Sequence, residues 1–282
     1  MRNKSNLLKS LVILIFMNAI LTHSCMSTRT RKATSIRIKG SDTMWLLTER
    51  WSEEYMKSHP SISIYAEGGG TVLGVQALIK GEAEICAASR PLRASEVRQL
   101  AEAHDKIGLR FLVAKDALSI FINYQNPIQT ISLQQLKDIF TGRITNWKQI
   151  GGLDQGIQVI TRSPNSGTYF YVKEHVLEGE EYTQAAKTVT STKNVVDAVF
   201  ENEAAIGYGG IAYGEDVKHC KIGNVAPTAE NVRNDSYPVI RYLYFYTIDS
   251  PRGATKAFID WVIKEGQAIV KSVGYIPIWQ HP

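Results

Sequence analysis

Short hydrophobic stretches alternate with amphipathic ones along most of this 282-residue chain. The hydrophobic stretches are rich in β-branched and aromatic residues, which is typical of strands. Between them, hydrophobic residues recur every three to four positions, which is typical of helices. The predicted strands are residues 35–39, 61–66, 83–88, 109–113, 117–123, 157–161, 187–191, 204–208 and 239–247. The predicted helices are residues 44–56, 72–80, 95–103, 133–140, 169–177, 195–200 and 251–264.

This alternation of strands and helices predicts an α/β fold with mainly parallel sheets. The length leaves room for two lobes, each with its own core. The hydrophobic stretches 117–123 and 239–247 have the composition of strands that cross between lobes. We therefore expect a discontinuous first lobe, residues 35–117 and 241–282, and a second lobe, residues 118–240.

The N-terminus has the pattern of a targeting segment. Three basic residues precede the apolar stretch 11–21, which is short for a membrane span. Residues 1–24 are therefore predicted to be a signal peptide. Cys25 follows it, as in a bacterial lipoprotein, and would carry the lipid ahead of a polar spacer ending at residue 34. Cleavage at a nearby site to give a secreted protein is the alternative. Both interpretations place the chain outside the cytoplasm, in the first case as a periplasmic or cell-surface lipoprotein on a bacterial membrane.

Removing the signal peptide changes the charge balance. It takes away three of the 32 basic residues and none of the 27 acidic ones, which leaves a net charge of 29 − 27 = +2. Without a basic stripe or aromatic platform, nucleic acid is not an expected partner. The histidines show no metal-ligand spacing, so neither a metal nor a cofactor is predicted. Cys86 is expected to be a small buried residue, and a disulfide with Cys220 stays open.

The chemistry concentrates in loops that join a strand to a helix. Arg162-Ser-Pro-Asn-Ser-Gly-Thr168 connects the strand 157–161 to the helix 169–177. Its small hydroxyl residues and glycine meet the free N–H groups and positive dipole of a helix N-terminus, where anions bind. Arg162 adds a planar donor fork suited to phosphate or carboxylate. Taken alone, however, a Ser-Gly-Thr sequence of this kind is more often a plain helix cap.

The same construction recurs elsewhere in the chain, which favours a ligand over simple capping. Gly40-Ser-Asp-Thr43 and Gly68-Gly-Gly-Thr71 each follow a predicted strand and begin a predicted helix. Ala87-Ala-Ser-Arg90 is a weaker fourth case. Because these loops leave the carboxyl ends of strands, they would meet at one edge. The sequence therefore predicts a multi-loop oxyanion site in which Arg162 is the only firm positive charge.

At this point the chain resembles the phosphate-binding receptors of bacterial ABC phosphate importers, which have the type II periplasmic-binding-protein fold. The resemblance runs in the family's order from about residue 36 to Pro277. It implies two lobes that close on dehydrated phosphate in the cleft between them, a membrane permease as partner, no cofactor and no catalysis. We also expect a monomer. The matching segments are Gly40–Thr43, Gly68–Thr71, Gly74–Gly81, Ala88–Pro91, Ile139–Trp147, Arg162–Thr168 and Ala205–Gly209.

Carried onto this sequence, the resemblance implies donors from both lobes. Some members of the family have an aspartate at the position of Ser89, which accepts the proton of phosphate. Asp42 or Glu67 could replace it here, and Asp42 is preferred because it lies inside a predicted loop of the site, although a plain helix-start carboxylate explains it equally well. The expected phosphate-binding residues are Ser41, Asp42, Thr43, Gly70 (through its backbone), Thr71, Ser89, Arg162, Ser166, Gly167 (through its N–H) and Thr168.

Three alternatives remain at this stage. The ligand could be another tetrahedral oxyanion such as sulfate, because the usual proton acceptor is missing. The chain could scavenge or sense phosphate without serving a transporter. A phosphate-ester enzyme is a distant third, because a nucleophilic Ser166 or Ser89 needs a base and His175 is the only nearby candidate.

Overall fold

The computed structural model describes residues 34–279, which belong to one compact unit. The predicted signal peptide, Cys25 and nearly all of the polar spacer lie outside the described residues. Within them, no helix combines the length and the hydrophobicity that a membrane span requires. The strands are β1 (Thr34–Gly40), β2 (Ile62–Gly69), β3 (Ile85–Ala88), β4 (Leu109–Ile122), β5 (Thr130–Ile131), β6 (Gln158–Arg162), β7 (Lys187–Val189), β8 (Ala205–Gly210), β9 (Lys218–Ile222) and β10 (Ile240–Thr247).

Helices separate most of these strands, as the sequence predicts. The α-helices are α2 (Asp42–Ser58), α3 (Thr71–Ile79), α4 (Ala94–His104), α5 (Leu133–Thr141), α6 (Gly167–His175), α7 (Thr192–Phe200), α8 (Ala229–Arg233), α9 (Gly253–Ile263) and α10 (Gln267–Val273). A 3₁₀ turn, η1 (Trp147–Ile150), follows α5. The order of elements and the alternation confirm the predicted α/β fold.

The strands hydrogen-bond in the order β2-β1-β3-β10-β4-β8-β6-β7, with β9 and β5 branching from β4. At one end β1 lies parallel to β2 and β3, and at the other β6 lies parallel to β7 and β8. The central strands β10 and β4 run antiparallel to their neighbours. The result is a mixed arrangement in which parallel strands form both ends.

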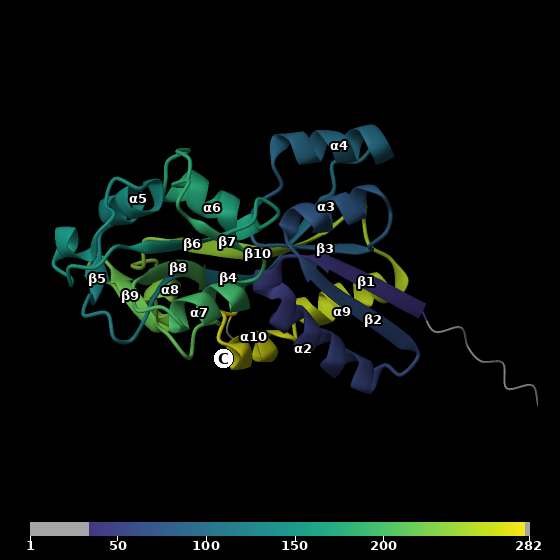
Figure 1. Ribbon diagram of the computed structural model, residues 1–282. Helices are drawn as coiled ribbons and strands as arrows, with labels where there is room; N and C mark the ends of the chain where they lie inside the picture. Colours follow the sequence, from purple (N-terminus) through teal and green to yellow (C-terminus); the bar gives the residue numbers. More distant parts are fainter. Residues whose placement is uncertain (1–33, 280–282) are drawn as a thin grey trace, which may run out of the picture. The chain divides into compact units, whose positions relative to one another are not determined.

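Two hydrophobic cores lie on either side of the central strands. One is built from β1–β3, α2, α9 and α10 against parts of β4 and β10, and includes Trp51, Phe245 and Phe258. The other is built from the strands and helices between β4 and β10, and includes Trp147 and Tyr208. We call the elements β1–β3, α2–α4, α9 and α10 the first lobe, and β5–β9 with α5–α8 the second lobe. Figure 1 shows α3 and α4 on one side of the first-lobe strands and α2 and α9 on the other.

The strand β4 corrects one prediction. The sequence suggested two strands, 109–113 and 117–123, because Lys115 and Asp116 interrupt the hydrophobic pattern. The structure has one strand, in which residues up to Ala117 pair with β10 and residues from Leu118 pair with β8. The two charged side chains do not break the strand because both are paired, Lys115 with Asp235 and Asp116 with an arginine of β10.

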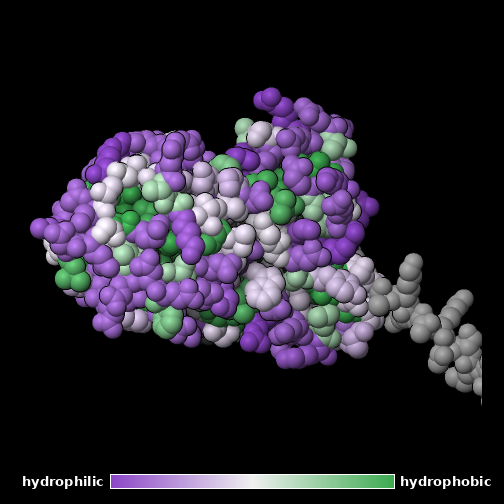
Figure 2. Space-filling model, viewed as in Figure 1, coloured by the Kyte–Doolittle hydropathy of each residue, from purple (hydrophilic) through white to green (hydrophobic). Residues whose placement is uncertain are grey.

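Several short elements were not predicted, namely β5, β9, α8 and α10. Each has seven residues or fewer, too few to show a clear periodicity. Cys86 and Cys220 are both buried and free, so Cys86 behaves as the predicted small core residue. On the face seen in Figure 2, hydrophilic residues predominate and hydrophobic ones form small, separate groups.

Candidate anion-binding site

Three helix N-termini face one another at the boundary between the lobes. Helices α2 and α3 begin after Ser41 and Gly70 in the first lobe, and α6 begins after Ser166 in the second. Each helix has at least nine residues, so its first turn carries the positive end of the dipole and N–H groups that have no partner within the helix ladder. Several contacts between these first turns show that they converge.

The start of α3 touches the loop before α6 through backbone atoms. The N–H of Val72 donates to the carbonyl oxygen of Asn165 at 3.1 Å. Gly70 lies in the left-handed region with φ of 107°, and a Cβ at this position would lie 2.7 Å from the carbonyl carbon of Asn165. Glycine is therefore required at position 70 for two reasons, the backbone conformation and the close approach of the other lobe.

Small hydroxyl side chains surround Gly167 at the first position of α6. A Cβ on Gly167 would clash with Thr71 Oγ1 and would lie 2.6 Å from Ser89 Oγ. Thr71 Oγ1 accepts a hydrogen bond from the N–H of Ser89 at 3.3 Å. Ser89 is fully buried, yet its Oγ has no hydrogen-bond partner among the residues that the structure describes. A buried hydroxyl without a partner is costly, so Ser89 Oγ is available to bond to a ligand oxygen or a water molecule.

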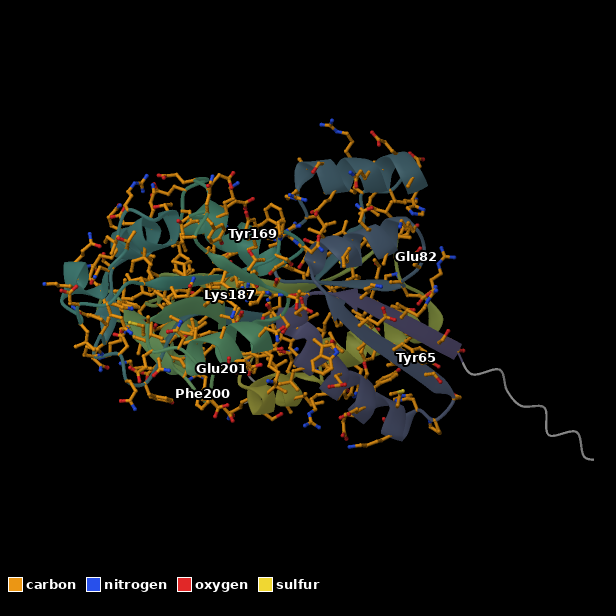
Figure 3. The ribbon with its side chains drawn as sticks, viewed as in Figure 1. Tyr65, Glu82, Tyr169, Lys187, Phe200 and Glu201 are labelled. Carbon is orange, nitrogen blue, oxygen red and sulfur yellow. The ribbon has the colours of Figure 1, made fainter. Side chains whose placement is uncertain are left out.

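Ser166 caps α6 and keeps its own proton free for donation. Its Oγ accepts from the N–H groups of Thr168 at 3.1 Å and of Tyr169 at 3.3 Å. Tyr169, labelled in Figure 3, lies on the first turn of α6. Because both contacts use acceptor lone pairs of Ser166, its hydroxyl hydrogen stays available.

Arg162 ends β6 and is 1% exposed. Its terminal nitrogens donate to Thr192 Oγ1 at 2.9 Å, to the carbonyl oxygen of Thr190 at 2.8 Å and to Asp42 Oδ2 at 2.7 Å. Its Nε is buried and has no partner among the described residues. Burial lowers the pKa of the Arg162 guanidinium, and the Asp42 carboxylate opposes that change. A guanidinium stays protonated despite such a shift, so Arg162 remains a cation whose Nε–H is unpaired among the described residues.

Asp42 lies inside the site and links the lobes. Besides its ion pair with Arg162, its Oδ1 accepts from the N–H of Gly69 at 2.8 Å. Glu67, the other candidate for the missing acceptor, points elsewhere, because its side chain is 65% exposed and pairs with Lys39. Of the two carboxylates considered from the sequence, only Asp42 contacts other residues of the site.

The structure adds a second arginine that sequence reasoning missed. Arg241 of β10 is 2% exposed and donates to Thr168 Oγ1 at 2.8 Å and to Thr43 Oγ1 at 3.3 Å. It is paired with the fully buried Asp116. The expectation that Arg162 is the only charged donor was therefore wrong. The available signal was an arginine within the otherwise hydrophobic and aromatic stretch 239–247.

A cleft of about 660 Å³ opens beside Asp42. Trp45 and Gly69 line it from the first lobe, and Thr192 and Lys193 line it from the second. Among residues 34–279, no group of three or more His, Cys, Asp or Glu side chains is arranged to hold a metal ion. The chemistry gathered here is hydroxyl, guanidinium and helix N–H donation, which suits an oxyanion.

The comparisons with known proteins agree with this chemistry. A family model described as the PBP superfamily domain matches residues 27–265. The phosphate-binding protein PstS of Bacillus subtilis is 32% identical over 252 residues, covering 86% of this chain and 81% of that protein. The chain belongs to this phosphate-binding protein family. Another member, PstS of Pseudomonas aeruginosa, is 29% identical over 263 residues, covering 85% of this chain and 81% of that protein.

Solved structures of the family have the same fold. A phosphate ABC transporter substrate-binding protein from Clostridium perfringens, with bound phosphate, matches with a TM-score of 0.82 and 32% identity. The match covers 87% of this chain and all of that one. An ABC-type phosphate transport receptor from Vibrio cholerae matches with a TM-score of 0.71 and 30% identity, over 86% of this chain and 99% of that one. The two-lobe periplasmic-binding fold predicted from the sequence is thereby confirmed, whereas the predicted lobe boundaries stay a prediction.

Proposed function

We propose that this chain binds inorganic phosphate outside the cytoplasm and delivers it to a membrane permease of the ABC type. The observation that carries the proposal is the convergence of three helix N-termini around two buried, unpaired donors, Ser89 Oγ and Arg162 Nε. The names of the relatives support phosphate as the ligand and transport as the role.

The donors available are sufficient for tight binding. In this proposal the side chains of Ser89, Arg162 and Ser166, the Thr71 hydroxyl and the first N–H groups of α2, α3 and α6 surround the anion. A hydrogen bond to a charged group contributes roughly 1.5–3 kcal/mol, and about 8 kcal/mol corresponds to a micromolar dissociation constant. Six or more such bonds can therefore offset desolvation of the anion and lobe closure.

Selectivity for phosphate over sulfate requires an acceptor, because phosphate carries a proton near neutral pH and sulfate does not. We assign that acceptor to Asp42, whose carboxylate already contacts Arg162 across the lobe boundary. A carboxylate so placed accepts the proton of phosphate and repels an oxyanion that has none. In this assignment Asp42 takes the role of the aspartate that some members of the family have at the position of Ser89.

Binding rather than catalysis is the better interpretation of the site. Among the described residues, Ser166 Oγ bonds to backbone N–H groups, and the ring of His175 lies tilted against that of Tyr171, with 4.3 Å between the centroids. A nucleophile needs a base within hydrogen-bond reach. Turnover of a chromogenic phosphomonoester that disappears in Ser166→Ala would move the assignment to an enzyme.

The proposal is tested by calorimetric titration of phosphate and sulfate into the chain that begins after the predicted signal peptide, across pH. We expect micromolar or tighter phosphate binding and weaker sulfate binding. In Asp42→Asn the ratio of the two affinities should fall at least tenfold, which is about 1.4 kcal/mol. Glu67→Gln is the matched control, because it removes an exposed carboxylate beside the same loop. Equal or tighter binding of sulfate by the wild-type chain would contradict the substrate assignment.

The membrane attachment is part of the same proposal. Cys25 would carry the lipid, and the polar spacer would let the folded lobes reach the permease. The attachment is tested by fractionating bacterial cells that express either the wild-type chain or Cys25→Ala. Release of the variant alone into the soluble fraction is expected, and equal release of both would show that Cys25 is not the anchor.

A further inference from the structure

A buried ion pair lies across the two strands that both lobes share. Arg241 of β10 stands directly opposite Asp116 of β4 in the antiparallel register. Arg241 Nε donates to Asp116 Oδ2 at 2.8 Å, and Asp116 Oδ1 accepts from the N–H of Ile211 at 3.0 Å. The side chains are 1% and 0% exposed. The carboxylate therefore holds the guanidinium in one orientation inside the protein.

The other end of the same guanidinium contacts one hydroxyl from each lobe. Nη1 donates to Thr168 Oγ1 of α6 at 2.8 Å, and Nη2 donates to Thr43 Oγ1 of α2 at 3.3 Å. The two hydroxyl oxygens lie 3.0 Å apart. A guanidinium has donors only, so each hydroxyl must use a lone pair toward Arg241 and keep its proton for another partner.

Counting protons shows what this arrangement offers to a ligand. Each threonine hydroxyl has one proton and two lone pairs. One lone pair of each is occupied by Arg241, and at the observed separation one hydroxyl also donates to the other. The remaining proton is free to point into the site. Toward a ligand, the Thr43–Thr168 pair therefore offers one proton, which belongs to the hydroxyl that does not donate to the other.

We infer that Arg241, held by Asp116, is a positioning residue that orients the Thr43–Thr168 hydroxyl pair so that its one free proton is donated to an unprotonated oxygen of the bound anion. This inference rests on the proposed function. In this arrangement an unprotonated oxygen of the anion faces the two threonines, and the proton of phosphate is left to Asp42, as in the proposed function.

This role explains the placement of a charged pair that stability alone does not explain. Burying an arginine and an aspartate costs desolvation that their attraction often only offsets. The pair is neutral as a unit, so it adds no net attraction for an anion. Its distinctive property is that one side chain on a shared strand contacts hydroxyls of both lobes.

A double-mutant cycle between Arg241 and Thr43 tests the inference. We expect Thr43→Val to weaken phosphate binding and sulfate binding by the same factor, at least tenfold, because both ligands place an unprotonated oxygen at the threonine pair. In the background of Arg241→Gln with Asp116→Asn, which removes both charges together, Thr43→Val should cost less than threefold, since the hydroxyl is no longer oriented. Arg241→Lys keeps the charge beside Asp116 and serves as a second background, in which the cost of Thr43→Val should also fall, because one ammonium group cannot reproduce the fork.

Melting temperatures without ligand accompany each titration and separate folding from binding. Lys115→Gln is the control for a change in the same strand and should leave both affinities unchanged. A cost of Thr43→Val that is equal in all backgrounds overturns the inference while leaving phosphate binding intact. A larger loss of affinity for phosphate than for sulfate in Thr43→Val also overturns the inference. Failure of the wild-type chain to bind any oxyanion overturns both this inference and the proposed function.

Discussion

Gly167→Ala separates folding from binding more sharply than any other single change in the site. Gly167 begins α6, at a backbone conformation that alanine adopts freely, and its Cα faces the hydroxyls of Thr71 and Ser89 in the other lobe. The added methyl group would enter the space in which these hydroxyls meet the start of the helix. Alanine is also the better helix former, by up to about 1 kcal/mol in a helix interior.

The expected magnitude follows from the distances. The new Cβ would lie 2.6 Å from Ser89 Oγ and closer still to Thr71 Oγ1, whereas ordinary contacts begin at 3.4 Å, so the lobes must separate by at least about 0.8 Å. Ser89 and Thr71 would then both lose their hydrogen bonds to the ligand. Two charge-assisted bonds contribute roughly 3–6 kcal/mol together, which predicts a loss of phosphate affinity of at least about a hundredfold.

The assay is calorimetric titration with phosphate, combined with urea denaturation in the absence of ligand. We expect an unfolding free energy equal to or above that of the wild-type chain and a greatly weakened phosphate affinity. Gly156→Ala is the matched control, because a Cβ there meets its nearest neighbour only at 3.8 Å. Wild-type affinity in Gly167→Ala would refute the placement of the ligand between Gly167, Thr71 and Ser89.

Two further predictions address charge. Arg162→Ala should weaken phosphate binding at least tenfold, because it leaves the anion and the Asp42 carboxylate without this cation. Arg50→Ala, which removes a 60% exposed side chain, is the control and should have no effect. Equal phosphate affinities of Arg162→Ala and the wild-type chain would place the site elsewhere. Burial lowers the pKa of His219, whose ring contacts Ser119 Oγ and a backbone carbonyl, so the folded state binds fewer protons than the unfolded state. Stability should therefore fall as pH drops below the ordinary value of 6.5, by at most about 1.4 kcal/mol per pH unit, and His219→Gln should flatten this part of the pH dependence in urea titrations. An unchanged slope in the variant would assign the acid sensitivity to other groups.

Local patterns were sufficient to predict most of the fold. The long helix α2 and the strands β1, β2 and β6 stand where periodicity and caps placed them. The loops that follow β1 and β2 come together because these strands are parallel and present their carboxyl ends at one edge. The loop after β6 belongs to the parallel strands of the other lobe and meets them across the lobe boundary. Asp42, Thr43, Gly70, Thr71, Ser89 and the segment from Arg162 to Thr168 all lie at or beside the lobe boundary.

What the sequence could not predict depends on contacts between distant segments. Arg241 stands in a strand that periodicity alone marks as core, and its partner Asp116 is 125 residues away. Only the register of β4 against β10 places the two side chains together. The same long-range pairing explains why β4 continues through Lys115 and Asp116, where the hydrophobic pattern suggests a break. The sequence also could not distinguish Glu67 from Asp42 as the proton acceptor, because the ion pair of Glu67 with Lys39 depends on the pairing of β1 with β2.

The most direct test of the central claim is a crystal structure of the chain grown with phosphate. The account predicts one phosphate at the lobe boundary, within hydrogen-bond distance of Ser89 Oγ and Arg162 Nε, with its oxygens facing the first turns of α2, α3 and α6. Phosphate bound elsewhere, or a boundary site that admits sulfate and excludes phosphate, would contradict it.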